Sequence, residues 1–341
     1  MLRVHFLNVG HGDCTLIQHH SGRLTMVDIN TSQEYDPDSF KELLSEEARK
    51  QYNPLAAGFG IGGGAQSAAV NALFGTPPGY GAGLLGMPTG YFEALAEAKK
   101  ELADPIAFLR ANYPGQRLWR FVLTHPDLDH MRGIKRLYEG IGFDNFWDTA
   151  HTKPTPEYRS NDDKVDWEFY QHLRSGAVGV HHRFFTRGDA FFAFAPQLPG
   201  SDSIEILSPT ADLITKCNKA GKSNDLSVVL RLWHAGCSVL LPADAESPAW
   251  DEMVRVYGNG LKSDFLKASH HGRDSGYHLD AVKLIAPYIT FVSVGRKPDT
   301  DASSKYRQQC LRVASTRYHG NIRLEIYDDG QWKWFVDRNP G

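Results

Sequence analysis

The sequence of 341 residues contains no long hydrophobic run. No stretch approaches the roughly 18 apolar residues that a membrane-spanning helix needs. The first apolar stretch is interrupted by Arg3, His5 and Asn8, so it does not resemble the apolar core of a secretory signal. These absences predict a soluble, cytoplasmic protein with no membrane partner.

Cysteine is scarce, and the charges nearly balance. The 4 cysteines are Cys14, Cys217, Cys237 and Cys310. They form no Cys-x-x-Cys pair of the kind that indicates a structural zinc or redox site, and we expect buried thiols in a reducing cytoplasm. The net charge of −3 lacks the positive excess typical of nucleic-acid-binding domains, although local patches can still bind phosphate.

Hydrophobic patterning predicts strands near the N-terminus. Short apolar segments at 2–9, 14–18 and 24–29 are separated by turn residues and predict an antiparallel meander. A polar stretch then predicts a helix at 37–52. Glycine is too dense in residues 57–90 for any regular element. We interpret this segment as a flexible loop, with a docking surface for a protein partner as the alternative.

The rest of the chain alternates between strands and helices. Strands are predicted at 118–123, 204–207, 226–233, 238–241, 265–269 and 290–294, helices at 91–111, 131–139, 249–257, 279–285 and 305–315, and two final strands around 328–330. This order predicts a mixed α/β (α+β) fold with two packed sheets and helices outside, a four-layer αββα sandwich. We expect a single domain over residues 1–341, with a Gly-rich insertion at about 31–115 and a polar insertion at about 151–200.

Potential metal ligands gather directly after the strand predicted at 118–123. His125, Asp127, Asp129 and His130 lie within six residues. Imidazole and carboxylate are the donors that divalent metals take in open catalytic sites. In an extended loop, alternate residues share one side, so one segment can serve two adjacent ions. The alternative is a polar loop in which Asp129 caps the following helix.

Two later strand ends carry similar residues. The strand predicted at 238–241 ends on Asp244, which can bridge two ions or cap the next helix. The strand predicted at 265–269 ends on His270 and His271, and paired histidines after a strand are more often ligands than core residues. Three predicted strand ends therefore carry histidine or aspartate residues that can bind a divalent metal ion.

Six ordered motifs resemble one superfamily. They are Phe6-Leu7-Asn8-Val9-Gly10-His11-Gly12-Asp13, Met26-Val27-Asp28, His125-Pro126-Asp127-Leu128-Asp129-His130, Asn224-Asp225-Leu226-Ser227-Val228-Val229-Leu230, Asp244 and His270-His271-Gly272. In these motifs the chain resembles the metallo-β-lactamase superfamily, and within it the hydrolase domain of the competence protein ComEC. The resemblance runs through most of the chain and implies the superfamily's αββα sandwich.

The resemblance implies a ligand set for one or two divalent ions. The first ion would be held by His125 and Asp127, the second by Asp129, His130 and one histidine of the pair His270 and His271, with Asp244 as the bridge and Asp28 orienting the metal loop. Asp127 replaces a histidine that most members have, which moves the preference from Zn²⁺ towards Mn²⁺ or Mg²⁺. The superfamily's third-motif histidine is absent, and Asn224 or Asp225 could take its place.

The resemblance also implies hydrolysis of phosphodiesters. A bound divalent ion lowers the pKa of water from about 15.7 towards about 7 and so supplies hydroxide at neutral pH. For catalysis we expect Asp129 to orient this hydroxide and Asp28 to support the loop. Lys267 and Arg273 are nearby cations that could hold a phosphate, with ordinary surface charge as the alternative for each. The leading hypothesis is a metal-dependent phosphodiesterase acting on nucleic acid or nucleotides. Hydrolysis of another ester, amide or lactone, or a partner-regulated or structural metal-binding module, is the alternative.

Overall fold

The computed structural model describes residues 1–32, 102–188, 202–295 and 298–338. All the elements below belong to one compact unit made of Met1–Glu34 and Ala103–Gly341. The helix predicted at 37–52 and the Gly-rich segment 57–90 lie outside the described residues, so the bounds of the Gly-rich insertion stay a prediction.

The first sheet, sheet A, begins with the predicted meander. In spatial order its strands are β14 (Trp332–Val336), β13 (Ile322–Ile326), β1 (Leu2–Phe6), β2 (Thr15–Gln18), β3 (Leu24–Val27), β4 (Leu118–Val122), β5 (Phe143–Asp148) and β6 (His181–Phe184). Strands β1, β2 and β3 are antiparallel, which confirms the meander, whereas β3 to β6 run parallel. The carboxyl ends of β3 and β4 therefore meet at the same edge.

The second sheet, sheet B, combines an antiparallel and a parallel half. In spatial order its strands are β12 (Arg312–Ser315), β11 (Ile289–Val292), β10 (Phe265–Lys267), β9 (Cys237–Leu241), β8 (Val229–His234) and β7 (Ile204–Ser208). Strands β7, β8 and β9 are antiparallel, and β9 to β12 are parallel. The carboxyl ends of β9 and β10 therefore also lie together.

Helices follow or connect many of these strands. They are α4 (Pro105–Asn112), α5 (Ile134–Gly140), α6 (Asn161–Arg174), α7 (Ala211–Ala220), α8 (Ser247–Tyr257), α9 (Leu279–Ile285), α10 (Ser303–Arg307) and α11 (Thr316–His319). Short 3₁₀ helices are η2 (Leu128–His130), η3 (Asn224–Leu226), η4 (Gly258–Leu261), η5 (Ser269–Gly272) and η6 (Asp274–Gly276). Helix α9 has the bounds that the sequence predicts.

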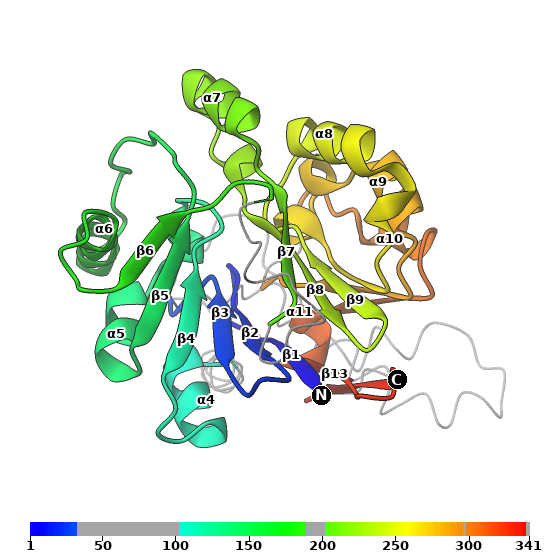
Figure 1. Cartoon of the computed structure of the whole chain (residues 1–341), viewed down its shortest axis with the longest axis horizontal. Coiled ribbons are helices and arrows are strands. Elements are labelled where there is room, and N and C mark those ends of the chain that lie inside the picture. Colours follow the sequence, from blue (N-terminus) through cyan, green and yellow to red (C-terminus); the bar gives the residue numbers. More distant parts are fainter. Residues whose placement is uncertain (33–101, 189–201, 296–297, 339–341) are drawn as a thin grey trace, which may run out of the picture. The chain divides into compact units, whose positions relative to one another are not determined.

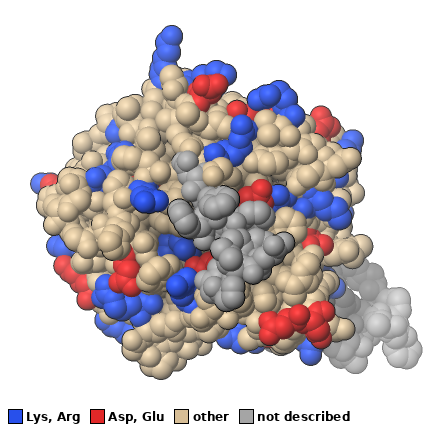
Figure 2. Space-filling view, viewed as in Figure 1, with Lys and Arg blue, Asp and Glu red and all other residues tan. Residues whose placement is uncertain are grey.

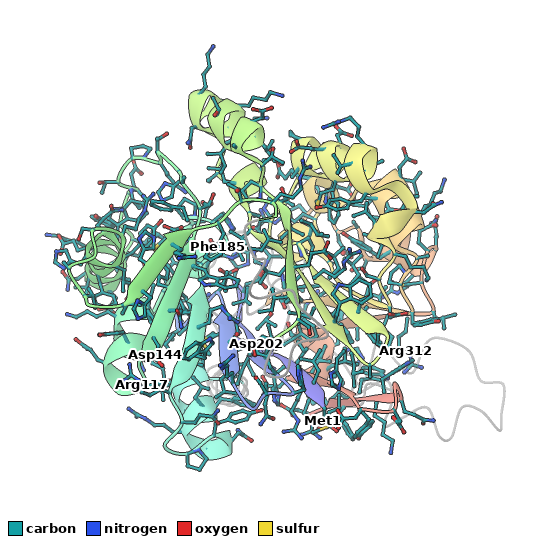
Figure 3. The ribbon with its side chains drawn as sticks, in the orientation of Figure 1. Met1, Arg117, Asp144, Phe185, Asp202 and Arg312 are labelled. Atoms are coloured by element: carbon teal, nitrogen blue, oxygen red, sulfur yellow. The ribbon has the colours of Figure 1, made fainter. Side chains whose placement is uncertain are left out.

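Side chains that alternate along the strands separate the layers. Ile17 of β2 and Leu230 of β8 lie in an apolar cluster between the two sheets, where Phe185 also packs (Figure 3). Leu16 of β2 faces the other way, into a cluster with α4, α5 and α6, and Val229 of β8 faces a cluster with α7, α8, α9 and α10. Figure 1 shows these helices outside the sheets. The predicted four-layer αββα sandwich is confirmed.

The helix predicted at 305–315 is partly wrong. Helix α10 ends at Arg307, and Arg312–Ser315 forms strand β12 parallel to β11. Ala314 on this strand is fully buried in the cluster between the sheets. Burial against β11 therefore outweighs the local preference for helix, because strand preference depends largely on such packing.

Helix α5 begins later than the predicted start at 131, because Gly133 adopts a left-handed φ of 93°. Asp166 of α6 accepts hydrogen bonds from Gly133 N at 2.6 Å and Lys135 N at 3.1 Å. This carboxylate caps the start of α5 and also holds the segment that precedes it. That preceding segment includes the predicted metal loop, residues 125–130, so α6 helps to position the loop.

Positive and negative side chains are interspersed on the described part of the face in Figure 2. Exposed pairs such as Arg117 and Asp144, 3.3 Å apart and labelled in Figure 3, belong to this mixed surface. No helix in the described ranges is long and apolar enough to cross a bilayer.

The cluster between the sheets should carry much of the stability. We expect Leu230→Ala to lower the free energy of unfolding by about 2–5 kcal/mol, because it leaves a cavity where the side chain is fully buried. Leu311→Ala is the matched control, since Leu311 is 84% exposed and its loss should stay within about 0.5 kcal/mol. Urea unfolding measures both, and equal losses would contradict the assignment.

Stability should also fall in mild acid. Burial, with Arg3 and Arg323 nearby, lowers the pKa of His5 from 6.5 to about 3. The unfolded chain therefore binds the additional proton between these values, so stability present above pH 6.5 is lost as the pH falls towards 3. His5→Phe should reduce the loss between pH 7.5 and 5 by about 2 kcal/mol. Urea midpoints at both pH values test this, with the exposed His172→Phe as control; an unchanged pH dependence in His5→Phe would refute it.

Candidate metal centre

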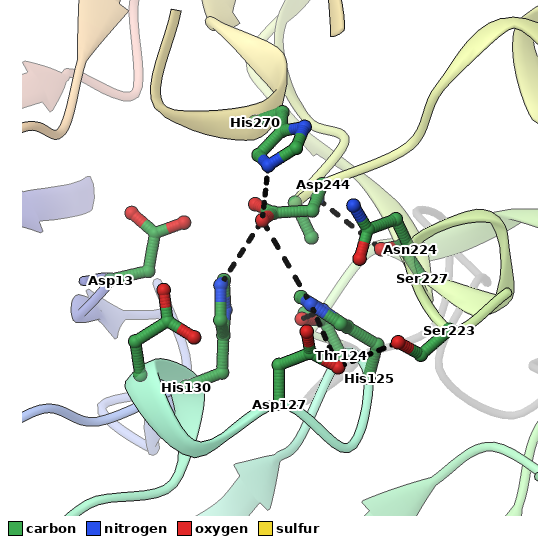
Figure 4. Close-up of polar contacts among 12 residues, drawn as sticks. Asp13, Thr124, His125, Asp127, His130, Ser223, Asn224, Ser227, Asp244 and His270 are labelled. Carbon is green, nitrogen blue, oxygen red and sulfur yellow. Dashed lines mark hydrogen bonds and ion pairs between the residues drawn. The ribbon is translucent and has the colours of Figure 1, made fainter. Parts of the chain in front are cut away.

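The predicted site residues come together where strands of both sheets end (Figure 4). Asp28 follows β3, the loop with His125 and His130 follows β4, Asp244 follows β9, and His271 follows β10. A hydrogen bond of 2.9 Å from His270 N to Ala243 O connects the last two segments. Because parallel strands bring their carboxyl ends to one edge, residues far apart in sequence share one site.

Several of these residues have unusual backbone conformations. Asp28, Ala243, His270 and His271 all have a left-handed φ, between 45° and 60°, although none is glycine. Such conformations are rare for side-chain-bearing residues and cluster at functional sites. Each of these residues lies just after the end of β3, β9 or β10, next to or among the candidate site residues.

Asp28 connects the metal loop to sheet A. Thr124 donates to it twice, from N to Oδ1 at 2.8 Å and from Oγ1 to Oδ2 at 2.7 Å. His130 Nδ1 donates to Asp28 Oδ2 at 2.8 Å. The buried carboxylate thus fixes the start and the end of the loop, which is the contact expected of an acid that orients metal ligands.

These hydrogen bonds determine which ring nitrogen of each histidine is free. His271 Nδ1 lies 3.1 Å from the carbonyl oxygen of Ser293, which can only accept, so Nδ1 carries the proton. The Thr124 hydroxyl donates to Asp28 and therefore accepts from His125 Nδ1 at 3.2 Å. In the neutral rings of His125, His130 and His271, Nε2 is left as an acceptor, the form that binds a metal.

His270 follows the same pattern on the other side of the site. Its Nδ1 lies 3.0 Å from Glu246 Oε1 and 2.8 Å from Ser275 Oγ. Donation to the carboxylate again leaves Nε2 as the free acceptor. Both histidines of the predicted pair therefore present Nε2 to the centre.

The four free nitrogens converge on one carboxylate oxygen. The distances from Asp244 Oδ2 are 3.4 Å to His130 Nε2, 3.6 Å to His271 Nε2, 3.7 Å to His270 Nε2 and 3.9 Å to His125 Nε2. Figure 4 shows Asp244 between three of these rings. Lone pairs facing a carboxylate oxygen repel one another unless a positive charge lies between them, so the arrangement requires protons or a metal ion.

The buried atoms at this point lack other partners. Among the described residues, His125 Nε2, His130 Nε2, His271 Nε2, Asp13 Oδ1 and Asp244 Oδ1 make no hydrogen bond. One ligand atom each from Asp13, His130, Asp244 and His271 lies within 4.8 Å of the others. Buried polar atoms are normally satisfied, so these residues fit a bound divalent ion, which would satisfy them together.

Electrostatics show how strongly the cluster attracts positive charge. Burial would raise the pKa of Asp244, but His271 and His130 hold it well below its usual range. Burial would lower the pKa of His130, but Asp244 and Asp28 raise it well above its usual range. Without an ion, protons on the imidazoles balance the carboxylates, and a divalent ion would replace them.

Asp129 lies beside the cluster at the solvent side. Its Oδ2 is 3.5 Å from His271 Nε2, and its side chain is 27% exposed. Burial would raise its pKa, but His271 and His130 hold the pKa well below its ordinary value. Asp129 is thus ionised next to the predicted ligands.

Asp13 is a candidate ligand that the sequence did not single out. It follows Gly12, whose φ of 137° and close approach to the Asp129 carbonyl oxygen leave no room for a side chain. Asp13 Oδ2 accepts from Lys267 Nζ at 2.5 Å, and Oδ1 faces the site. The Gly-x-Gly-Asp turn after a strand was the available signal, but it indicated a turn more directly than a ligand.

Lys267 therefore has a carboxylate partner, and its side chain is 4% exposed. The predicted role of Lys267 in holding a phosphate is untested, but its ammonium group is already paired with Asp13. A second lysine, Lys153, was not predicted. Its Nζ lies 2.6 Å from Asp127 Oδ1, which also accepts from Ser223 Oγ at 2.7 Å.

Asn224 and Asp225 make contacts outside the cluster. Asn224 Nδ2 lies 3.4 Å from Glu246 Oε1. Asp225 Oδ1 accepts from the backbone nitrogens of Glu246 at 3.1 Å and Ala249 at 3.3 Å, at the start of α8. In the described structure, Asp225 acts as a helix cap. Their predicted part as substitute ligands stays a prediction.

Comparisons with known proteins identify distant similarities. No family model matches the sequence. The chain is 21% identical over 221 residues to the uncharacterised protein YcaI of Escherichia coli (strain K12), which covers 62% of this chain. The match covers only 24% of YcaI, so the chain spans about a quarter of that relative.

Three solved structures are similar at low identity. Igni18, a metallo hydrolase from Ignicoccus hospitalis, has 11% identity and a TM-score of 0.44, covering 98% of this chain and 100% of its own. The metallo-β-lactamase fold protein YhfI from Bacillus subtilis has 11% identity and a TM-score of 0.40, covering 92% and 96%. CmlA, a diiron β-hydroxylase from Streptomyces venezuelae, has 12% identity and a TM-score of 0.39, covering 89% and 46%.

The site and the fold together define a class of protein. A buried His/Asp group of this composition, placed where strands of two packed sheets end, suggests a metal-dependent hydrolase. The imidazole and carboxylate donors fit divalent ions in general. The resemblance to the ComEC branch stays a prediction.

Removing the acid that orients the loop should weaken metal binding. An amide nitrogen cannot accept a hydrogen bond, so Asp28→Asn loses at least one contact to Thr124 or His130 and frees the His130 ring to move its proton to Nε2. We expect Mn²⁺ or Zn²⁺ to bind about 10- to 100-fold more weakly by calorimetry. Asp212→Asn, at an exposed position of α7, is the control. Equal affinities would show that Asp28 does not position the ligands.

Proposed function

We propose that the protein is a metal-dependent phosphodiesterase that acts on nucleic acid or nucleotides. The observation that supports this most is the convergence of four imidazole Nε2 atoms on Asp244 Oδ2. In the described part of the chain, three of these nitrogens, those of His125, His130 and His271, make no hydrogen bond. The cluster needs a cation, and its position at the ends of strands is typical of catalytic rather than structural sites.

The donor set favours hard ions and phosphoryl chemistry. Carboxylates of Asp13 and Asp244 contribute alongside the imidazoles, and oxygen donors favour Mn²⁺ or Mg²⁺ more than an all-nitrogen set does. When bound, such an ion acts as a Lewis acid and activates water at neutral pH. Asp13, His130, Asp244 and His271 would hold it.

The protein's own groups supply orientation. Asp28 and the Ser293 carbonyl hold the His130 and His271 rings before any substrate arrives, so the ligands need no reorganisation. The ionised Asp129, partly exposed beside His271, can accept a hydrogen bond from an attacking water molecule and so orient it.

Hydrolysis of bis-p-nitrophenyl phosphate and of single- and double-stranded DNA tests the proposal. Metal-stripped protein should be inactive and should recover with Mn²⁺, Mg²⁺ or Zn²⁺. Asp129→Ala should lower the metal-restored rate by about 100-fold or more, because it removes the group that orients the attacking water molecule. Asp212→Ala, an exposed aspartate of α7, should keep the wild-type rate.

A parallel assay with p-nitrophenyl acetate and a lactone separates the rival functions. Turnover of these neutral substrates, with none of any phosphodiester under any metal, would refute the phosphodiesterase and favour acyl chemistry. Turnover of neither class by a protein that binds metal would favour a structural or partner-regulated site.

A further inference from the structure

Lys153 lies in the loop between β5 and α6 and reaches Asp127 in the metal loop. Its Nζ is 2.6 Å from Asp127 Oδ1, and Ser223 Oγ donates to the same oxygen at 2.7 Å. That oxygen also lies 3.8 Å from His125 Nε2. The ammonium group therefore contacts the carboxylate oxygen that an ion beside His125 would use.

The position of Lys153 is held by its backbone. Lys153 N donates to His151 Nδ1 at 2.9 Å, and His151 is buried against the Tyr170 hydroxyl at 2.5 Å. The preceding residue, Thr152, donates from N to Asn218 Oδ1 at 3.0 Å. The side chain is 26% exposed, so the ammonium group is partly shielded from solvent. These contacts direct the lysine at Asp127.

The two halves of the centre differ in their available donors. On the His125 side, Asp127 Oδ1 is engaged by Lys153 and Ser223, while Asn224 and Asp225 contact Glu246 and the start of α8. On the other side, Asp13, His130, Asp244 and His271 offer four buried ligand atoms within 4.8 Å of one another. Among the described residues, this second group is the one whose ligand atoms lie so close together, although His125 Nε2 and His270 Nε2 also face Asp244 Oδ2 at 3.9 Å and 3.7 Å.

We propose that the centre holds a single divalent ion, at Asp13, His130, Asp244 and His271, and that the Lys153 ammonium group supplies positive charge where a second ion would otherwise bind. A divalent ion on Asp127 would stand next to this ammonium group, and like charges repel strongly at short range in a partly buried site. Lys153 thus acts through Asp127 and not on the substrate, and it determines whether the centre binds one ion or two. The inference rests on the proposed function only for the presence of a metal centre.

Metal stoichiometry and the electron paramagnetic resonance of Mn²⁺ test this on the full chain. The wild-type protein titrated with Mn²⁺ should bind one ion per chain and show an isolated-ion spectrum. Lys153→Met removes the charge and frees Asp127, so it should bind two ions and show a spin-coupled pair.

Two further variants complete the design. Lys153→Arg keeps the positive charge and should retain one ion. Lys164→Met removes a lysine of similar size from an exposed pair with Glu168 on α6, and it should also retain one ion. A spin-coupled pair in the wild-type protein overturns the inference even if Lys153→Met does not fold. A folded Lys153→Met that still binds one ion overturns it too.

These outcomes are separate from those of the proposed function. A wild-type protein with one ion and no phosphodiester cleavage would refute the phosphodiesterase and leave the metal count intact. Two bound ions together with phosphodiester cleavage would support the phosphodiesterase and overturn the single-ion inference. Absence of any bound ion would overturn both.

Discussion

The rest of the structure is arranged around the accumulation of acceptor atoms at Asp244. In the ranges that the structure describes, the Nε2 atoms of four histidines face the buried Asp244 carboxylate, and those of His125, His130 and His271 make no hydrogen bond. Each unsatisfied buried polar atom costs about 1–3 kcal/mol, so the cluster is destabilising until protons or an ion balance it. The apolar layers on either side must offset that cost, and they also keep the ligands from relaxing away from one another.

The hydrogen bonds that the histidines make through Nδ1 explain why their Nε2 atoms remain acceptors. Asp28, the Thr124 hydroxyl, the Ser293 carbonyl and Glu246 each accept a hydrogen bond from Nδ1 of a histidine. Had any of these partners been a donor, the ring would present N–H to the site and could not bind a metal. The chemistry of the centre therefore depends as much on these four partners as on the ligands themselves.

Two lysines illustrate how tertiary contacts decide the role of a charge. Lys267 stands at the end of a strand next to the predicted ligands, yet its buried ammonium group pairs with Asp13, 254 residues away in sequence. Lys153 lies in a polar stretch with no recognisable motif, yet the loop brings it onto Asp127. Lys267 contacts Asp13 Oδ2 and leaves Oδ1 without a partner, whereas Lys153 contacts Asp127 Oδ1, the oxygen that lies 3.8 Å from His125 Nε2.

The sequence by itself determined the layers of the fold and most of the candidate ligands. Period-two hydrophobicity predicts the strands because a half-buried sheet demands it, and ligand-type residues at strand ends are visible as short local runs such as His125 to His130. Only the tertiary structure decided that Arg312–Ser315 is a strand, that Asp13 faces the site, and that Lys153 reaches Asp127. Each of these depends on a partner distant in the chain, and local preference is too weak to reveal such a contact.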